Sequence, residues 1–326
     1  MTATVTVDVA GAQMGGAARL AGELYSYLAR TGRTDVDIVG QGRPLSPAWL
    51  VRREICHPAR GRQVALNNVS FLRPGAPRWV LLRNALHFPT GEEAASLGRD
   101  LRRAMRRDSA VVRAASRRAD RLVVPCSAMA ERVARSIPAA RNRIAVRMHP
   151  VSAGSVLAGA VPAGTRELSI LCPVLFAPYK RMGERLAELL AAVDEYGDPD
   201  VRVQVTASPA DLTPALAAHP RLEFLGRVDP AQLGQAWAAS RAIYFPTGLE
   251  SFGYPLAEAR VLGRPVIARD SAQNKEIAGP ALRGFDPADP ASLHDAVQAA
   301  LTDAVTPDPA PFDPVAYFDW MLGDSS

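Results

Sequence analysis

Short apolar runs alternate with amphipathic helical patterns along the whole chain. In the first helical pattern, residues 17–30, the side chains of Leu20, Leu24 and Leu28 recur at helical spacing and share one face. Strands that alternate with helices of this length are typical of α/β proteins with parallel sheets. The runs expected to be strands are residues 4–10, 36–39, 63–71, 78–83, 121–125, 144–148, 168–173, 201–206, 222–225, 241–245 and 265–268.

A stretch rich in Pro, Gly and small residues, 150–167, separates two such series. The chain has 326 residues, a length that favours two domains. We therefore expect a doubly wound, Rossmann-like domain over residues 1–160 and a second over residues 161–305. Residues 306–326 are broken by prolines and end in aromatic residues, which predicts a C-terminal segment that packs back toward the first domain.

The stretch FPTGLESFGYPLAEARVLG, residues 245–263, organises the second series. Pro255 stands near the expected start of a helix and Gly263 just past its expected end. A strand that turns directly into a helix presents unpaired amides, which favour a phosphate. Glu250 and Glu258 flank this turn, and carboxylates bind the hydroxyls of sugars well. The alternative is a surface helix with two solvated acids.

In the first series, Gly15 and Gly16 stand in a glycine-rich loop between a strand and a helix, the order found at phosphate sites. The spacing is not G-x-G-x-x-G, so no dinucleotide fingerprint is expected. Polar residues follow two later strands, where parallel sheets bind ligands, although turn formation explains asparagine equally well. These candidates are Asn67, Asn68, Arg83, Asn84 and His87.

Composition excludes several classes of protein. A hydrophobic content of 48% is ample for a packed core and excludes disorder. The three cysteines are far apart and the five histidines are scattered, so no metal site is expected and the compartment is reducing. No apolar run is long enough for a membrane span or a signal peptide. We expect a soluble, cytoplasmic protein.

The net charge of +5 is unevenly distributed. Residues 99–121 contain nine arginines and three aspartates, with apolar residues at helical spacing on the opposite face. This pattern predicts a docked helix with a solvated arginine-rich back, and an anionic membrane surface or acidic partner is the less favoured alternative. Nucleic acid is not expected as a partner because no aromatic residues interleave with the arginines.

Residues 222–305 resemble the donor-binding half of glycosyltransferase family 4, which comprises retaining enzymes of the GT-B fold. The resemblance rests on F-x-G-x-V at 224–228, the acid–small–Phe–Gly turn, the Glu-x7-Glu spacing from Glu250 to Glu258, and G-x-P-V-I at 263–267. It implies an α/β GT-B architecture, in which two Rossmann-like domains face each other across a cleft. It also implies transfer of a sugar from a nucleotide-diphosphate sugar to a hydroxyl acceptor without a metal.

The resemblance implies roles for individual residues. Glu250 would face the donor sugar, Lys180 would neutralise the diphosphate and His87 would act on the acceptor side, and these three are the candidate catalytic residues. The acceptor-side candidates further include Asn67, Asn68, Arg83 and Asn84. Glu258 would hold the ribose and Val228 would lie near the nucleobase. The remaining donor-binding positions that match the family are Gly15, Gly16, Arg181, Ser251, Phe252, Gly253 and Tyr254.

Two departures from the family pattern affect these roles. Leu175 stands where the family carries an arginine, for which Arg181 or Arg185 can substitute, and residues 149–152 differ from the family's usual segment. The acceptor is expected to be a small molecule, such as a secondary metabolite or sugar intermediate. Alternatives are a GT-B nucleotide-sugar epimerase or hydrolase, or an inactive transferase-like scaffold.

Overall fold

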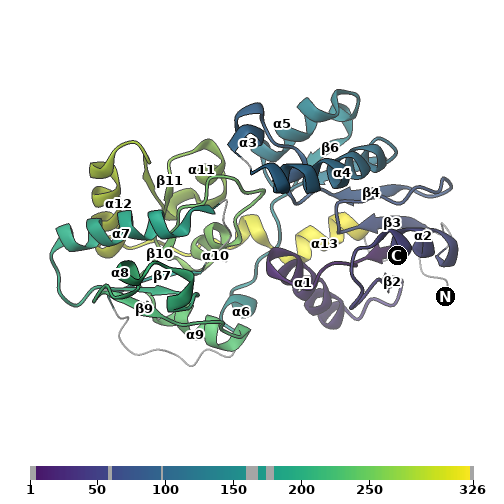
Figure 1. The fold of residues 1–326 in the computed structure, drawn as a ribbon. Helices are drawn as coiled ribbons and strands as arrows, with labels where there is room; N and C mark the ends of the chain where they lie inside the picture. Colours follow the sequence, from purple (N-terminus) through teal and green to yellow (C-terminus); the bar gives the residue numbers. More distant parts are fainter. Residues whose placement is uncertain (1–4, 58–60, 97, 159–167, 174–179, 324–326) are drawn as a thin grey trace. The chain divides into compact units, whose positions relative to one another are not determined.

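The computed structural model describes residues 5–57, 61–96, 98–158, 168–173 and 180–323. Within these residues, twelve strands form two six-stranded sheets, ordered β2-β1-β3-β4-β5-β6 and β12-β11-β10-β7-β8-β9 (Figure 1). Every strand pairing is parallel, which confirms the α/β class. Contacts divide the chain into two units: Met1–Pro150 with Leu249–Phe252 and Phe312–Ser326, and Val151–Gly248 with Gly253–Pro311.

The first unit contains the first sheet and the last helix of the chain. Its strands are β1 (Val5–Asp8), β2 (Val36–Val39), β3 (Arg62–Ala65), β4 (Arg78–Leu81), β5 (Arg121–Val124) and β6 (Ile144–Val146). Its helices are α1 (Gly15–Thr31), α2 (Pro47–Cys56), α3 (Gly91–Ser96), α4 (Arg99–Ser116), α5 (Ser127–Ser136) and α13 (Pro314–Leu322), with the 3₁₀ turns η1 (Ala85–His87) and η2 (Pro138–Arg143).

The second unit contains the second sheet. Its strands are β7 (Ser169–Cys172), β8 (Arg202–Val205), β9 (Leu222–Phe224), β10 (Ala242–Phe245), β11 (Val266–Arg269) and β12 (Leu282–Phe285). Its helices are α6 (Ala153–Val156), α7 (Met182–Tyr196), α8 (Pro214–Ala217), α9 (Pro230–Ala239), α10 (Tyr254–Leu262), α11 (Ala272–Ala278) and α12 (Pro290–Thr302), with the 3₁₀ turns η4 (Pro209–Asp211) and η5 (Gly279–Ala281). The 3₁₀ turn η6 (Ala310–Phe312) leads back to the first unit.

The core of the first unit joins the two ends of the sequence. Leu20, Leu24 and Tyr27 of α1 pack with the central strands and with α13, which lies beside α1 (Figure 1). The hydroxyl of Tyr27 donates a 2.5 Å hydrogen bond to Asp319. The aromatic residues near the C-terminus therefore complete the core of the first sheet, because strands buried on both faces need apolar cover on each.

Helix ends in the second unit are determined by particular residues. Asp229 and Gln232 form a capping box at the start of α9. Helix α10 has Pro255 in its first turn and ends at Gly263, which adopts a left-handed conformation with φ 63°. A Cβ at Gly263 would lie 2.7 Å from the carbonyl oxygen of Val305, so glycine is required there for space as well as conformation.

The arginine-rich helix is shorter than the sequence predicts. Helix α4 ends at Ser116, whose hydroxyl donates to the carbonyl of Val112, and a turn follows over Arg117–Ala119. Arg121 is the first residue of β5 and pairs with Trp79 of β4. The expected helix over 99–121 is therefore wrong in its last residues, because strand pairing with β4 takes over before the helical pattern ends.

Candidate active site

The order of strands in the second sheet places a topological switch point between β7 and β10. From β7 the chain proceeds outward through β8 to β9, then returns to β10 on the other side of β7. In open parallel sheets, ligands bind beyond the carboxyl ends of the strands at such a switch point. The segments that follow β7 and β10 contain Lys180 and Glu250, so these two donor candidates follow the strands that flank the switch point.

The turn from β10 into α10 depends on Gly253. This residue adopts φ 82° as the N-cap of α10, and a Cβ there would lie 2.9 Å from Phe245 Cε1. Any side chain would therefore be strained and overpacked. The turn opens the nine-residue helix α10, whose first amides have no intrahelical acceptor and present the positive end of the helix dipole.

The residues that precede this helix contact the first unit, to which Leu249–Phe252 belongs by its contacts. Ser251 Oγ donates a 2.6 Å hydrogen bond to the carbonyl of Arg83, and its own carbonyl accepts from Cys126 Sγ at 3.3 Å. Phe252 is buried, with its ring centroid 4.9 Å from that of His149. The neighbouring Glu250 is half-buried.

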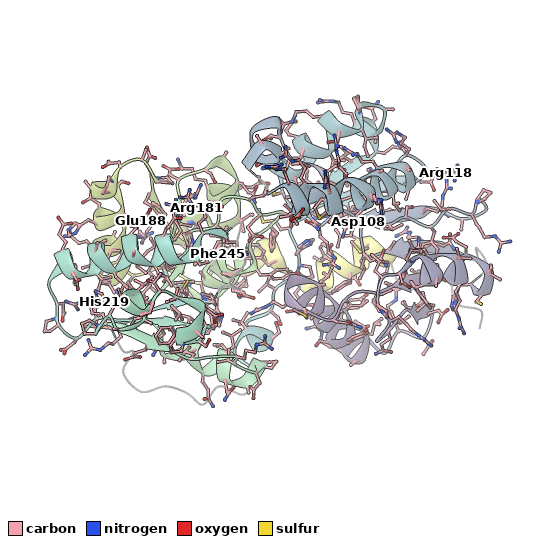
Figure 2. The ribbon with its side chains drawn as sticks, in the orientation of Figure 1. Asp108, Arg118, Arg181, Glu188, His219 and Phe245 are labelled. Atoms are coloured by element: carbon pink, nitrogen blue, oxygen red, sulfur yellow. The ribbon has the colours of Figure 1, made fainter. Side chains whose placement is uncertain are left out.

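A group of cations follows β7. Lys180 is half-buried and lies close enough to Cys172 to oppose the burial that raises the pKa of that thiol to about 12. Arg181, which Figure 2 labels, is the N-cap of α7 and adopts a left-handed conformation. Its Nε donates a hydrogen bond to Glu184 at 2.9 Å. Arg185 pairs with Glu188 at 2.7 Å, and its carbonyl accepts from the hydroxyl of Tyr244 on β10. Leu175 lies outside the described residues.

The other donor candidates differ in how far their side chains are buried. Glu258, on α10, is fully buried, so a ribose can contact its carboxylate only after a local rearrangement. Tyr254 is the first residue of α10 and is half-buried. Val228 is also half-buried and stands after the edge strand β9, just before the N-cap of α9. In the first unit, Gly15 and Gly16 form the start of α1, with Gly15 at φ 56°.

Asn67, Asn68 and Arg83 meet beyond β3 and β4. Asn67 is buried, and its Nδ2 donates to Asp8 at 2.8 Å. Asn68 has φ 69°, and its Oδ1 accepts from the amide of Arg83 at 2.7 Å. Arg83 Nε donates to the carbonyl of Leu66 at 2.7 Å. These contacts fit the turn alternative for both asparagines, because each side chain stabilises local backbone or a buried charge.

Asn84 and His87 form a second small network with α4. Asn84 caps η1 through the amide of Leu86, and its Nδ2 lies 3.4 Å from His87 Nε2. His87 Nδ1 lies 3.5 Å from the hydroxyl of Ser109. Burial lowers the pKa of His87 to about 4, with smaller effects of nearby charges. The imidazole is therefore neutral near pH 7 and able to accept or donate a hydrogen bond.

Two polar groups at strand ends were not among the candidates predicted from the sequence. Asp8, at the end of β1, is fully buried and accepts from Trp49 Nε1, Arg53 Nη1 and the amide of Ala10 as well as from Asn67. In the second unit, Arg269 ends β11, beside the turn that follows β10. The rule that ligands bind beyond strand ends would have found both residues, since each closes an apolar run.

One hollow in the surface of the second unit is lined by a single donor candidate. A hollow of about 860 Å³ opens beside the first turn of α7 and the segment 211–219. Arg181 is the one residue of the predicted donor set that lines it. Among the described residues, no three His, Cys, Asp or Glu side chains gather as a metal-binding group, and no helix has the length and apolar character needed to cross a bilayer.

Comparisons with known proteins support glycosyl transfer. Residues 172–303 match the family described as "Glycosyl transferases group 1". No curated protein sequence matches the chain.

Solved structures of similar fold extend over nearly the whole chain. Sucrose-phosphate synthase from Thermosynechococcus elongatus is 15% identical, covers 98% of this chain and 94% of its own, and has a TM-score of 0.63. WaaG, a glycosyltransferase involved in lipopolysaccharide biosynthesis, is 16% identical, with coverages of 96% and 92% and a TM-score of 0.64. An α,α-trehalose 6-phosphate synthase from Burkholderia multivorans is 12% identical, with coverages of 97% and 94% and a TM-score of 0.59. At these identities the likeness is one of fold. The chain thus has the two-domain α/β fold of these GT-B glycosyltransferases. The match to the family model is confined to residues 172–303.

Proposed function

We propose that the protein transfers a sugar, with retention of configuration, from a nucleotide-diphosphate sugar to a hydroxyl of a small-molecule acceptor such as a secondary metabolite or sugar intermediate. One observation carries this proposal: the matched family segment contains the switch point of the second sheet, between β7 and β10. Lys180 and Arg181 stand in the chain between β7 and α7, and α10 follows β10. Cations and a helix N-terminus are suited to a diphosphate, whose negative charge increases as it leaves.

Each donor residue has a proposed role. Lys180 and Arg181 neutralise the diphosphate, and the backbone of Ser251, Phe252, Gly253 and Tyr254 contacts its oxygens and the sugar. Glu250 accepts hydrogen bonds from the sugar hydroxyls, which an ionised carboxylate does well. Glu258 holds the ribose and Val228 contacts the base, while Gly15 and Gly16 permit close approach of the backbone in the first unit.

The proposed reaction needs no metal and no protein nucleophile. The C1–O bond of the donor sugar breaks, and the departing phosphate oxygen accepts the proton of the acceptor hydroxyl as the new glycosidic bond forms on the same face. The neutral imidazole of His87 is suited to hold a hydroxyl of the acceptor, because it can accept or donate a hydrogen bond without adding charge. Asn68, Arg83 and Asn84 hold the local backbone in place, and Asn67 contacts Asp8.

A thermal-shift panel with UDP, GDP, dTDP and ADP tests the donor class. A ligand present at 100 times its dissociation constant stabilises the folded state by about 2.7 kcal/mol. We expect one nucleotide to stand out. The matching nucleotide sugar is then incubated with and without acceptors: product that requires the acceptor supports transfer, whereas conversion of the donor alone indicates an epimerase or hydrolase. A flat panel favours the inactive scaffold.

A second candidate is transfer to a lipid-linked acceptor on an anionic membrane. Helix α4 carries five exposed arginines, of which one is Arg99 at its start and four lie within residues 102–107: Arg102, Arg103, Arg106 and Arg107. None of the five forms an ion pair with a carboxylate of the described residues. Helix α2 exposes Val51 and Ile55, and Val111 of α4 is also exposed. Cationic and apolar side chains together favour binding to such a surface.

Vesicle sedimentation distinguishes the two candidates. Binding to vesicles of phosphatidylglycerol but not phosphatidylcholine, abolished by high salt or by changing the four arginines within residues 102–107 to glutamine, would favour the lipid-linked acceptor. The small-molecule proposal predicts that the protein stays in the supernatant with both lipids.

A further inference from the structure

The guanidinium of Arg269 is held against the backbone at the carboxyl end of β10. In the parallel register, Ala268 of β11 pairs with Phe245 of β10, so Arg269 is level with Pro246. Its Nε donates a 3.0 Å hydrogen bond to the carbonyl of Pro246. Its Nη1 lies 2.6 Å from the position of a Cβ built on Gly248. Glycine at 248 therefore permits the guanidinium to lie directly against this turn.

Among the described residues, the guanidinium of Arg269 has hydrogen-bond donors that are not used. It is half-buried, it forms no ion pair there, and neither Nη1 nor Nη2 makes a hydrogen bond within that part of the chain. Burial is the main effect that lowers its pKa, followed by the nearby Arg185, while Tyr244 and Glu188 oppose the shift to a smaller extent. A guanidinium remains protonated at neutral pH. Arg181 and Arg185, by contrast, pair with Glu184 and Glu188. The site thus contains a positive charge with unused donors.

Thr247 supplies an independent sign of a ligand. This residue lies in the turn that Arg269 contacts and is only 7% exposed. Its Oγ1 has no hydrogen-bond partner among the described residues. A buried hydroxyl without a partner is unfavourable, so such groups commonly mark a position that a water, an ion or a substrate fills.

We infer that Arg269 and Thr247 form an anion subsite that binds the diphosphate of the nucleotide sugar. This inference rests on the proposed function and assigns to it two residues outside the predicted donor set. The subsite lies beyond the carboxyl ends of β10 and β11, next to the switch point at which parallel sheets bind ligands.

The chemistry of both side chains suits a phosphate. The two outer nitrogens of a guanidinium match two oxygens of a phosphate in parallel hydrogen bonds, and the threonine hydroxyl can donate to a third oxygen. Because Nε is fixed by Pro246, the group is oriented before the ligand binds. A fixed cation next to the leaving diphosphate would stabilise the charge that develops there during transfer.

Calorimetry with three probes tests the subsite: the nucleoside diphosphate selected by the thermal-shift panel, its nucleoside, and inorganic pyrophosphate. We expect Arg269→Ala to weaken the diphosphate and pyrophosphate about 10- to 100-fold, as for loss of hydrogen bonds to a charged group. The nucleoside should bind unchanged, Arg269→Lys should lose less, and Thr247→Val should lose about 3- to 10-fold. The matched control is Arg283→Ala. Arg283 lies on β12, the strand next to β11, and pairs with Asp303.

The outcomes separate the subsite from the proposed function. Arg269→Ala and Thr247→Val variants that bind both phosphate probes like the wild type overturn the subsite, while transfer can still stand. Arg269-dependent binding of pyrophosphate without any nucleotide binding supports the subsite and overturns the proposed donor class. A wild type that binds none of the probes overturns both. If Arg269→Ala does not fold, as judged by circular dichroism, Arg269→Lys and Thr247→Val decide the result.

Discussion

The two sheets share one architecture but treat their switch points differently. In the first sheet the switch point lies between β1 and β3, and in the second between β7 and β10. At the first, the buried carboxylate of Asp8 is enclosed by Arg53, Trp49 and Asn67. At the second, Arg269 and Thr247 retain hydrogen-bonding groups without partners among the described residues.

This difference shows that the switch point of a parallel sheet can serve two purposes. A buried charge whose hydrogen bonds are all made internally holds neighbouring segments together and leaves nothing for a ligand. A cation and a hydroxyl that remain unsatisfied beside a helix N-terminus provide binding groups at a cost in stability. We therefore propose a structural role for the buried Asp8 at the first switch point and substrate binding for Arg269 and Thr247 at the second, and the predictions below test this contrast.

The largest expected effect concerns the first switch point, where the carboxylate of Asp8 is buried. Arg53 is 1% exposed, and its Nη1 lies 2.7 Å from Asp8 Oδ2. The change Arg53→Met leaves the buried carboxylate without its cation and should destabilise the protein by about 3–5 kcal/mol. Urea unfolding measures the loss. The exposed neighbour provides the control, since Arg52→Met should change stability little. Equal stabilities of the two variants would contradict the structural role of Asp8.

The next largest effect concerns turnover and the role of Glu250 near the second switch point. We expect Glu250→Ala to lower turnover by about 10²-fold, as for loss of a contact made in the transition state. The dissociation constant of the nucleoside diphosphate should change little, because Glu250 is assigned to the sugar. Initial rates with the nucleotide sugar provide the measurement, and Glu223→Ala removes an exposed carboxylate of β9 as the control. Wild-type turnover in Glu250→Ala would refute the assignment.

Acid should weaken the first unit through two buried histidines. Burial lowers the pKa of His87 to about 4 and that of His149 to about 3. The unfolded chain therefore binds more protons than the folded chain between these values and about pH 6.5. The contribution of each neutral histidine to the free energy of unfolding is fully present above pH 6.5. It is lost as the pH falls through that range, by about 2 kcal/mol per histidine at pH 5.

Urea unfolding at pH 7.5 and pH 5 measures this effect. His87→Asn and His149→Asn should each reduce the difference in unfolding free energy between the two pH values, whatever they do to stability at pH 7.5. The partly exposed His57 supplies the control variant, His57→Asn. A pH difference that both variants leave intact would contradict the burial of neutral imidazoles.

The sequence predicted the elements of the fold better than the contacts of the site. Periodicity located β10 and α10 to within a residue or two, because Pro255 and Gly263 act locally. It missed the dependence of Asp8 on Trp49 and Arg53, which are more than forty positions away in the sequence. The end of the apolar run marks Arg269 as a candidate, but the pattern does not show which polar groups remain without partners in the fold.

The smallest expected effect concerns Glu258 and shows whether its buried carboxylate contacts the ribose. Because the side chain is fully buried on α10, the isosteric change Glu258→Gln keeps its volume and removes its charge. If the carboxylate accepts hydrogen bonds from a ribose after local rearrangement, the nucleoside diphosphate should bind about 10-fold more weakly, with turnover at saturation nearly unchanged. Calorimetry with the nucleotide and with its 2′,3′-dideoxy analogue provides the measurement.

The analogue serves as the control because it lacks the ribose hydroxyls, so the variant should bind it as the wild type does. An equal loss for both ligands would show that Glu258 shapes the unit without contacting the ribose, and the second switch point would then resemble the first in enclosing one of its acids.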